Sequence, residues 1–288
     1  MENSDNSKKR IDPILFSDLA VERRRADIDI PGIEFRKEPG ESGGWECVKI
    51  TSKEGSESIG RPIGTYDTLN TGRMELMNDE EIDDAKEDVA KRLCRIFSDL
   101  DIIPEKLLVV GLGNRNLTPD SVGPKAAREV RPTMHIREFD SDMFDSLECS
   151  EIAVLSPGVS AESGMEASEI VKGVIRRILP DAVIAVDAIA SRSEERLGST
   201  IQISDTGIFP GSGVGNTRKA INEATVGVPV ISIGVPTVID SRVFSGGAPR
   251  NDSVYGMMVA PKEIDEITSV AAKIIGGAIN QAFGISAI

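Results

Sequence analysis

The sequence is poor in the residues on which several common kinds of enzyme site depend. Its 288 residues include one histidine, His135, and three cysteines, Cys47, Cys94 and Cys149. A zinc site with several histidine ligands is therefore excluded, and a Ser-His-Asp or Cys-His arrangement would have to use His135. We interpret His135 as a strand-entry or surface-loop residue. The cysteines lack CxxC spacing, which favours a reduced cytosol over a disulfide framework or a zinc site.

Positive charge and long apolar runs are also scarce. The 33 lysines and arginines face 47 aspartates and glutamates, giving a net charge of −14. This balance disfavours a general nucleic-acid binder, because phosphate neutralisation needs clustered basic residues. No apolar run is long enough for a membrane span, and the polar residues 1–10 predict no signal peptide. The ordinary apolar content of 40% predicts a substantial core within one overall domain.

The pattern of apolar residues predicts an α/β fold. We expect strands at 107–113, 151–156, 182–190, 200–204 and 228–235, and helices at 79–100, 123–130, 163–179 and 261–283. Runs that are apolar throughout indicate strands buried on both faces. We therefore predict a mostly parallel twisted sheet with helices on both faces. Residues 1–45 show no sustained periodicity, and we interpret them as a tail leading into a small amino-terminal lobe.

Two aspartates follow or end the most apolar strands. Asp120 lies on a predicted turn just beyond the strand at 107–113, and Asp187 lies near the carboxyl end of the strand at 182–190. In open α/β sheets, ligands bind in the crevice outside the carboxyl ends of the strands. A carboxylate after an apolar run is costly to bury unless it is protonated, paired or functional. We therefore take Asp120 and Asp187 as a candidate acid/base pair.

Other residues near the strand ends are candidate supporting groups. Arg192 could be a structural partner of Asp187, and Asp205 could be a third acid or a turn cap. Gly211, Ser212 and Gly213 begin a glycine-rich loop whose backbone N–H groups could face an oxyanion. This loop lacks the lysine and Ser/Thr of a P-loop, and no third glycine completes a dinucleotide fingerprint after Gly111.

Two chemistries fit a pair of carboxylates at an open crevice. Because two neighbouring carboxylates cannot both ionise cheaply, they would share a proton. The ionised acid could then activate water against a peptide carbonyl, while the protonated acid donates to the carbonyl oxygen or leaving amine. The same geometry could instead hold a hard divalent metal. The residues alone leave both alternatives open.

A series of longer motifs resembles the germination proteases of spore-forming bacteria. The resemblance covers residues from about 105 to 240 and resumes at 258–263. Its motifs are Gly-Leu-Gly-Asn from Gly111, Thr-Pro-Asp from Thr118 with Gly123-Pro124, Pro-Gly-Val from Pro157, Gly-Met-Glu from Gly164, Val-Asp-Ala from Val186, Ala-Ser-Arg-Ser from Ala190, Thr-Ile-Gln-Ile-Ser-Asp-Thr-Gly from Thr200, Pro-Gly-Ser-Gly-Val-Gly-Asn from Pro210, Gly-Val-Pro-Thr-Val-Ile from Gly234 and Met-Val-Ala-Pro-Lys-Glu from Met258.

This resemblance implies an endopeptidase that begins degrading small acid-soluble spore proteins when a spore germinates. It implies a cytoplasmic enzyme of the forespore and germinating spore core, made as an inactive homotetrameric zymogen that processes itself. The implied fold is similar to that of hydrogenase maturation endopeptidases. The implied catalytic pair matches Asp120 and Asp187, in an atypical aspartic mechanism with no cofactor, no established metal dependence and no binding to nucleic acid or membrane.

The resemblance also implies a self-cleavage site. Family substrates are cut after an acidic residue that precedes an apolar residue and alanine, and Ser17-Asp18-Leu19-Ala20 has that form. We therefore expect cleavage between Asp18 and Leu19, with residues 1–18 as propeptide, 19–104 as amino-terminal lobe and leading helix, and 105–288 as catalytic core. The tail could instead only anchor on the body. Two functional alternatives also stay open, a metal-assisted maturation-type peptidase and a non-catalytic binding protein for spore proteins.

Overall fold

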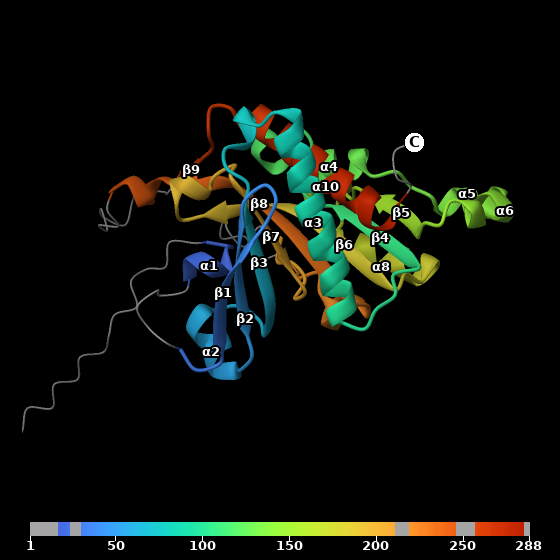
Figure 1. Ribbon diagram of the computed structural model, residues 1–288, viewed down its shortest axis with the longest axis horizontal. Coiled ribbons are helices and arrows are strands. Elements are labelled where there is room, and N and C mark those ends of the chain that lie inside the picture. The colour runs from blue at the N-terminus through green and yellow to red at the C-terminus, as the bar shows by residue number, and fades with distance from the viewer. Residues whose placement is uncertain (1–16, 24–29, 211–218, 246–256, 285–288) are drawn as a thin grey trace, which may run out of the picture.

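A single mixed sheet runs through the computed structural model, which describes residues 17–23, 30–210, 219–245 and 257–284 (Figure 1). Within these residues the sheet has nine strands in the order β1-β2-β3-β7-β8-β6-β4-β5, and β9 pairs with β8. The strands are β1 (Ile33–Pro39), β2 (Gly44–Ile50), β3 (Gly64–Asn70), β4 (Lys106–Gly111), β5 (Glu151–Leu155), β6 (Ala182–Ser191), β7 (Thr200–Ser204), β8 (Val230–Asp240) and β9 (Met258–Val259).

The prediction of a mostly parallel sheet was wrong. Strands β8, β6, β4 and β5 are parallel to one another, but β1, β2, β3, β7 and β8 form successive antiparallel pairs. The expected irregular tail through residue 45 was wrong as well, because β1 begins at Ile33. Strand β1 alternates polar and apolar residues and is apolar on one face only, and a short turn joins it to β2. Such strands pair as antiparallel hairpins and lack the continuous apolar run of buried parallel strands.

Helices cover both faces of the parallel part, as predicted. Helices α3 (Asp79–Asp99), α4 (Val122–Glu129) and α10 (Ile264–Phe283) pack on the face that includes Leu107 and Val109. Helix α8 (Ala167–Ile178) packs on the opposite face, against Leu108 and Val110. In Figure 1, α3 and α10 lie together in front of the sheet. The alternation of neighbouring residues between two cores explains why β4 is apolar throughout.

The remaining helices are short and lie mainly at the ends of the sheet. They are α1 (Ala20–Arg23), α2 (Lys53–Ile59), α5 (Met134–Phe139), α6 (Ser141–Ser146), α7 (Ser160–Ser163) and α9 (Glu223–Val226), with 3₁₀ turns η1 (Met74–Leu76), η2 (Thr118–Asp120), η3 (Glu194–Arg196) and η5 (Ser241–Ser245). Helices α1 and α2 pack with Val48, Ile50 and Tyr66 in a third, smaller core. They therefore cover the antiparallel end of the sheet.

A buried ion-pair cluster fastens α3 to the amino-terminal strands. Arg92 contacts Asp67 on β3 at 2.8 Å and Glu38 on β1 at 2.7 Å. Its guanidinium also lies 4.2 Å from the centre of the Trp45 ring on β2. Since only 6% of the Arg92 side chain and 3% of the Asp67 side chain are exposed, each charge depends on the other. One arginine thus connects three strands to the long helix.

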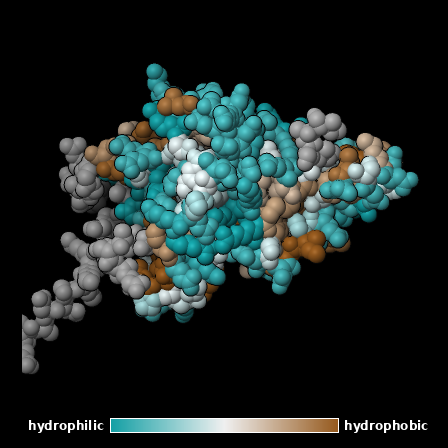
Figure 2. Space-filling view, in the orientation of Figure 1, coloured by the Kyte–Doolittle hydropathy of each residue, from teal (hydrophilic) through white to brown (hydrophobic). Residues whose placement is uncertain are grey.

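The surface that carries α3 is mainly hydrophilic. Figure 2 shows hydrophobic residues on this face in separate small groups. Among the helices that the structure describes, none combines the length and the apolar character needed to cross a membrane.

Candidate active site

The first candidate acid, Asp120, lies in the loop that leaves the carboxyl end of β4. It closes the 3₁₀ turn η2, where its N–H donates to the Leu117 carbonyl at 2.8 Å. Its carboxylate Oδ2 accepts a hydrogen bond from the Asn114 N–H at 2.8 Å. The loop thus folds back on itself and holds the carboxylate through its own backbone. The turn expected at Pro119 and Asp120 is present.

Two glycines of this segment allow a close approach of backbones that other residues would prevent. Gly113 has φ of +109°, and a Cβ there would lie 2.1 Å from the carbonyl oxygen of Asp120. At Gly123, a Cβ would lie 2.2 Å from the Leu112 carbonyl oxygen and 2.4 Å from that of Val186. The first turn of α4 therefore rests directly on the backbone just beyond the end of β4 and on that of β6 at Val186. Glycine is required at both positions because any side chain would displace the loop.

The second candidate acid, Asp187, lies inside β6. It follows Val186, which pairs with Gly111 at the end of β4, and it pairs with Gly234 of β8. Asp187 is 5% exposed, and its Oδ1 accepts a hydrogen bond from the Ala188 N–H at 2.9 Å. Because β6 continues beyond the end of β4, Asp187 lies beside the loop that carries Asp120.

Both aspartates line one cavity of about 460 Å³. The cavity opens at the carboxyl ends of β4 and β6, which is the position expected for a site in an open α/β sheet. Its walls also include Leu112, Gly113, Pro119, Ser232, Thr237, Phe209 and Met258. The structure therefore brings together two residues that are far apart in the sequence.

The amino-terminal segment reaches the same cavity. Asp18 is among the lining residues and donates its N–H to the Ala190 carbonyl at 2.8 Å. The Asp18 carboxylate accepts from the Ala190 N–H at 2.9 Å and from Arg61 Nη2 at 2.9 Å. The next residue, Leu19, is completely buried. The predicted cleavage site thus lies against β6, three residues along the strand from Asp187.

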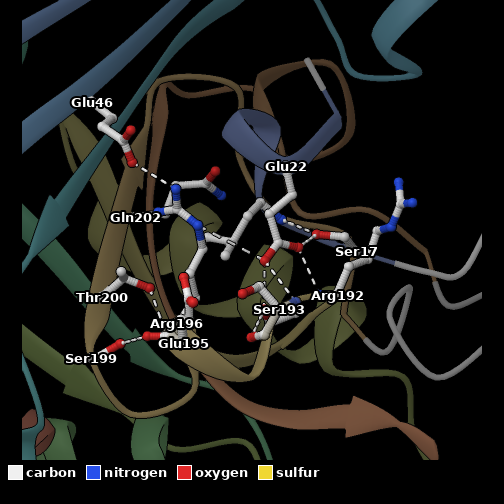
Figure 3. A network of polar contacts seen from close by, with 12 residues as sticks. Ser17, Glu22, Glu46, Arg192, Ser193, Glu195, Arg196, Ser199, Thr200 and Gln202 are labelled. Carbon is white, nitrogen blue, oxygen red and sulfur yellow. Dashed lines mark hydrogen bonds and ion pairs between the residues drawn. The ribbon is translucent and has the colours of Figure 1, made fainter. Parts of the chain in front are cut away.

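A glutamate of α1 holds this segment in place (Figure 3). Glu22 Oε1 accepts from the Ser191 hydroxyl at 2.6 Å and from the Ser193 N–H at 3.1 Å. Its Oε2 accepts from the Arg192 N–H at 2.7 Å and from the Ser17 hydroxyl. The carboxylate therefore joins α1 to the turn that follows β6, on the same strand that carries Asp187.

The other predicted supporting residues lie elsewhere. Arg192 has an exposed side chain and contributes its backbone N–H to Glu22. Asp205 accepts from the Thr65 N–H at 2.8 Å, at the junction of β3 and β7, and is not among the residues that line the cavity. Gly211, Ser212 and Gly213 lie outside the described residues. His135 lies exposed on the short helix α5, so its expected place at a strand entry or in a surface loop was wrong.

Burial changes the titration of two groups near the site. It raises the pKa of Tyr66, which lines the cavity, to about 12, so this phenol stays protonated at ordinary pH. The Tyr66 hydroxyl donates to the Pro62 carbonyl at 2.9 Å and accepts from the Thr206 hydroxyl at 3.1 Å. Burial also raises the pKa of Asp205, although the hydrogen bond from Thr65 opposes the shift.

The described residues contain no group of three or more histidine, cysteine, aspartate or glutamate residues placed to hold a metal ion. The cavity presents two carboxylates, a protonated phenol and the residues of β6 that follow Asp187. This set can carry acid/base chemistry on a peptide lying along β6.

Sequence reasoning missed three residues that hold the amino-terminal segment, namely Arg61, Glu22 and Gln202. Gln202 Oε1 accepts from the Ala20 N–H at 2.8 Å, and its Nε2 donates to the Asp18 carbonyl at 3.3 Å. Gln202 lies 182 positions from Ala20 and Arg61 lies 43 from Asp18, so no local pattern relates them. The motif that begins at Thr200 includes Gln202, but its resemblance alone indicates no role for it.

Comparison with known proteins gives consistent matches. The family model described as germination protease matches residues 15–248. The germination protease of Caldanaerobacter subterraneus subsp. tengcongensis is 44% identical over 257 residues, which cover 88% of this chain and 75% of the relative. That of Clostridium perfringens is 35% identical over 312 residues, covering 92% of this chain and 93% of the relative. Among solved structures, the [NiFe] hydrogenase maturation protease HycI from Thermococcus kodakarensis matches with a TM-score of 0.38 and 19% identity, over 66% of this chain and 99% of that one.

Proposed function

This chain belongs to the germination protease family, and on that premise we propose that it is an endopeptidase of small acid-soluble spore proteins. Its proposed role is to begin their degradation during germination, in the cytoplasm of the spore core. The observation that carries the proposal is the shared cavity, which Asp120, Asp187 and Asp18 all line. A catalytic pair and a peptide of the chain itself therefore meet at one place.

In the proposed mechanism, Asp120 and Asp187 act as one acid/base unit. The pair shares a single proton, because two adjacent carboxylates cannot both ionise cheaply. The ionised carboxylate takes a proton from water, and the hydroxide attacks the peptide carbonyl carbon. The protonated carboxyl donates its proton to the carbonyl oxygen. As the tetrahedral intermediate collapses, the acid that took a proton from water passes it to the leaving amine, and the hydroxyl formed from the carbonyl returns its proton to the other carboxylate.

We further propose that the chain is made as a self-processing zymogen. Asp18 is held on β6 by a backbone hydrogen bond to the Ala190 carbonyl and by a hydrogen bond from the Ala190 N–H to its carboxylate, and the next residue, Leu19, is buried. Cleavage of the bond between them would release residues 1–18 and leave α1 attached through Glu22. Before cleavage, the segment occupies the place of a substrate. Following the family, we propose that the zymogen is a homotetramer, which sedimentation of the purified protein would test.

The proposed function is tested with a purified small acid-soluble spore protein as substrate. After incubation at mildly acidic pH, we expect mass spectrometry to find fragments cut after acidic residues. The Asp120→Asn chain should bind the substrate without producing fragments. Cleavage that a chelator abolishes and a divalent ion restores would instead indicate a metal-assisted peptidase. Binding without any fragments from the unaltered chain would indicate a non-catalytic binding protein.

A further inference from the structure

The carboxylate of Asp18 occupies a site built from two elements that are independent of its own segment. Arg61, in the loop between α2 and β3, donates from Nη2 to Oδ1 at 2.9 Å. The Ala190 N–H of β6 donates to Oδ2 at 2.9 Å. The side chains of Arg61 and Asp18 are 12% and 10% exposed, so water screens this ion pair poorly. Charge-assisted hydrogen bonds of this kind are stronger than neutral ones.

Other contacts close to Asp18 are made by the backbone of the segment. The Asp18 N–H donates to the Ala190 carbonyl, and the Gln202 side chain binds the Asp18 carbonyl and the Ala20 N–H. Arg61 Nη2 also donates to the Ser17 carbonyl at 3.0 Å. Any peptide could make these contacts, whatever its side chains. Among these contacts, the one that distinguishes an acidic side chain at position 18 is the carboxylate contact.

The fold positions the backbone of Arg61 without help from residue 18. The Ser56 hydroxyl donates to the Arg61 carbonyl at 2.7 Å, and α2 ends at Gly60 with φ of +69°. The Arg61 Nε–H has no hydrogen-bond partner among the described residues. A largely buried guanidinium with a free donor is costly to leave without an anion. The site would therefore favour another carboxylate once Asp18 has left it.

We propose that Arg61 and the Ala190 N–H form a carboxylate-binding subsite that selects an acidic residue in the peptide to be cut. Before maturation the subsite is filled by Asp18 of the same chain, with Leu19 in the adjoining buried position. The inference rests on the proposed peptidase function and names the group that determines its specificity. Arg61 is a specificity residue here, since it contacts the peptide and not the atoms that react.

The test is a double-mutant cycle on self-cleavage in the full chain. We expect Asp18→Asn and Arg61→Met each to slow the loss of residues 1–18 about 10- to 100-fold, the usual worth of a hydrogen bond to a charged group. The double variant should be no slower than the slower single variant, because both changes remove the same contact. Arg61→Lys, which keeps the charge, should recover part of the rate with Asp18 and none with Asp18→Asn.

Gln202→Met is the matched control. Gln202 is uncharged and holds the same segment through two backbone groups, the Asp18 carbonyl at 3.3 Å and the Ala20 N–H at 2.8 Å. In a double variant, the fold-reduction in cleavage rate that this control causes should therefore multiply with the fold-reduction caused by Asp18→Asn. The proposal is overturned if Asp18→Asn matures at the unaltered rate. It is also overturned if the rate reductions caused by Arg61→Met and Asp18→Asn multiply in the double variant, as expected for the control.

A second readout separates this inference from the proposed function. If the unaltered chain never loses residues 1–18, the self-cleavage proposal fails. Hydrogen exchange of the Ala190 amide then tests separately whether the subsite binds the Asp18 carboxylate. Asp18→Asn and Arg61→Met should each lower the protection of this amide, with no further loss in the double variant. Unchanged protection in both single variants would overturn the subsite even if the protein proves to be a peptidase.

Discussion

Replacing Gly123 with alanine should damage both stability and catalysis, because the first turn of α4 lies directly on the backbones of Leu112 and Val186. The added Cβ would lie 2.2 Å from the Leu112 carbonyl oxygen, 2.4 Å from the Val186 carbonyl oxygen and 2.6 Å from the Leu112 nitrogen. All three are backbone atoms of the sheet, so no side chain can turn away to make room. Relief requires α4 to move by about 1 Å to reach ordinary contact distance.

The expected cost of this movement is about 3 kcal/mol of unfolding free energy, the upper part of the range for overpacked cores. The movement would also carry Asp120, three residues before Gly123, away from Asp187. A misplacement of about 1 Å in a catalytic group commonly costs on the order of 100-fold in rate. Both losses therefore have one geometric cause.

Urea unfolding and the rate of self-cleavage would measure the two losses. Gly173→Ala is the matched control, because Gly173 lies exposed in α8 and a Cβ there meets nothing within 4 Å. The control should gain about 0.5–1 kcal/mol from reduced backbone entropy and keep its activity. If Gly123→Ala unfolds at the same urea concentration as the unaltered protein, the described contact between α4 and the strands is refuted.

Two further predictions concern buried charges. Arg92→Met should lower the unfolding free energy by about 3–5 kcal/mol, because it leaves Asp67 buried without its ion partner. The control Lys91→Met, on the exposed side of α3, should lower it by less than about 1 kcal/mol. Equal urea unfolding midpoints for the two variants would contradict this prediction. The raised pKa of Asp205 means that its contribution to stability is fully present below its unfolded pKa and is lost as pH rises through its folded pKa. Asp205→Asn should therefore gain stability relative to the unaltered chain as pH rises from acid to neutral, and a difference independent of pH would refute this.

The parallel half of the sheet could be predicted from sequence because its strands are buried on both faces. The apolar run that begins at Ala182 predicts a central strand, and the structure has β6 there. The amino-terminal strands could not be recognised in the same way. Strand β1 has only seven residues, too few for its polar and apolar residues to give a clear period on their own. Its pairing with β2 defines it as a strand. The relative direction of the strands was therefore predicted wrongly in the amino-terminal part of the sheet, where the sequence pattern is weakest.

The candidate site shows the same division. Asp120 and Asp187 could be proposed because each comes after an apolar run typical of a buried strand, and ligands bind beyond the carboxyl ends of such strands. Arg61 and Glu22 carry no such signal, since each acts on a residue or turn far away in the sequence. Asp205 also ends a strand, yet it accepts from the Thr65 backbone at another junction. Strand-end position alone does not separate a candidate catalytic acid from a structural one.

Mass spectrometry of the purified chain, moved from neutral to mildly acidic pH, tests the central claim most directly. We expect residues 1–18 to be lost from the unaltered protein and retained by Asp120→Asn and Asp187→Asn. The control is Asp88→Asn, which alters a buried aspartate that holds the backbone of Glu41 and Ser42 and is not among the cavity-lining residues. It should mature normally. Maturation of either the Asp120→Asn or the Asp187→Asn chain at the unaltered rate would contradict the account.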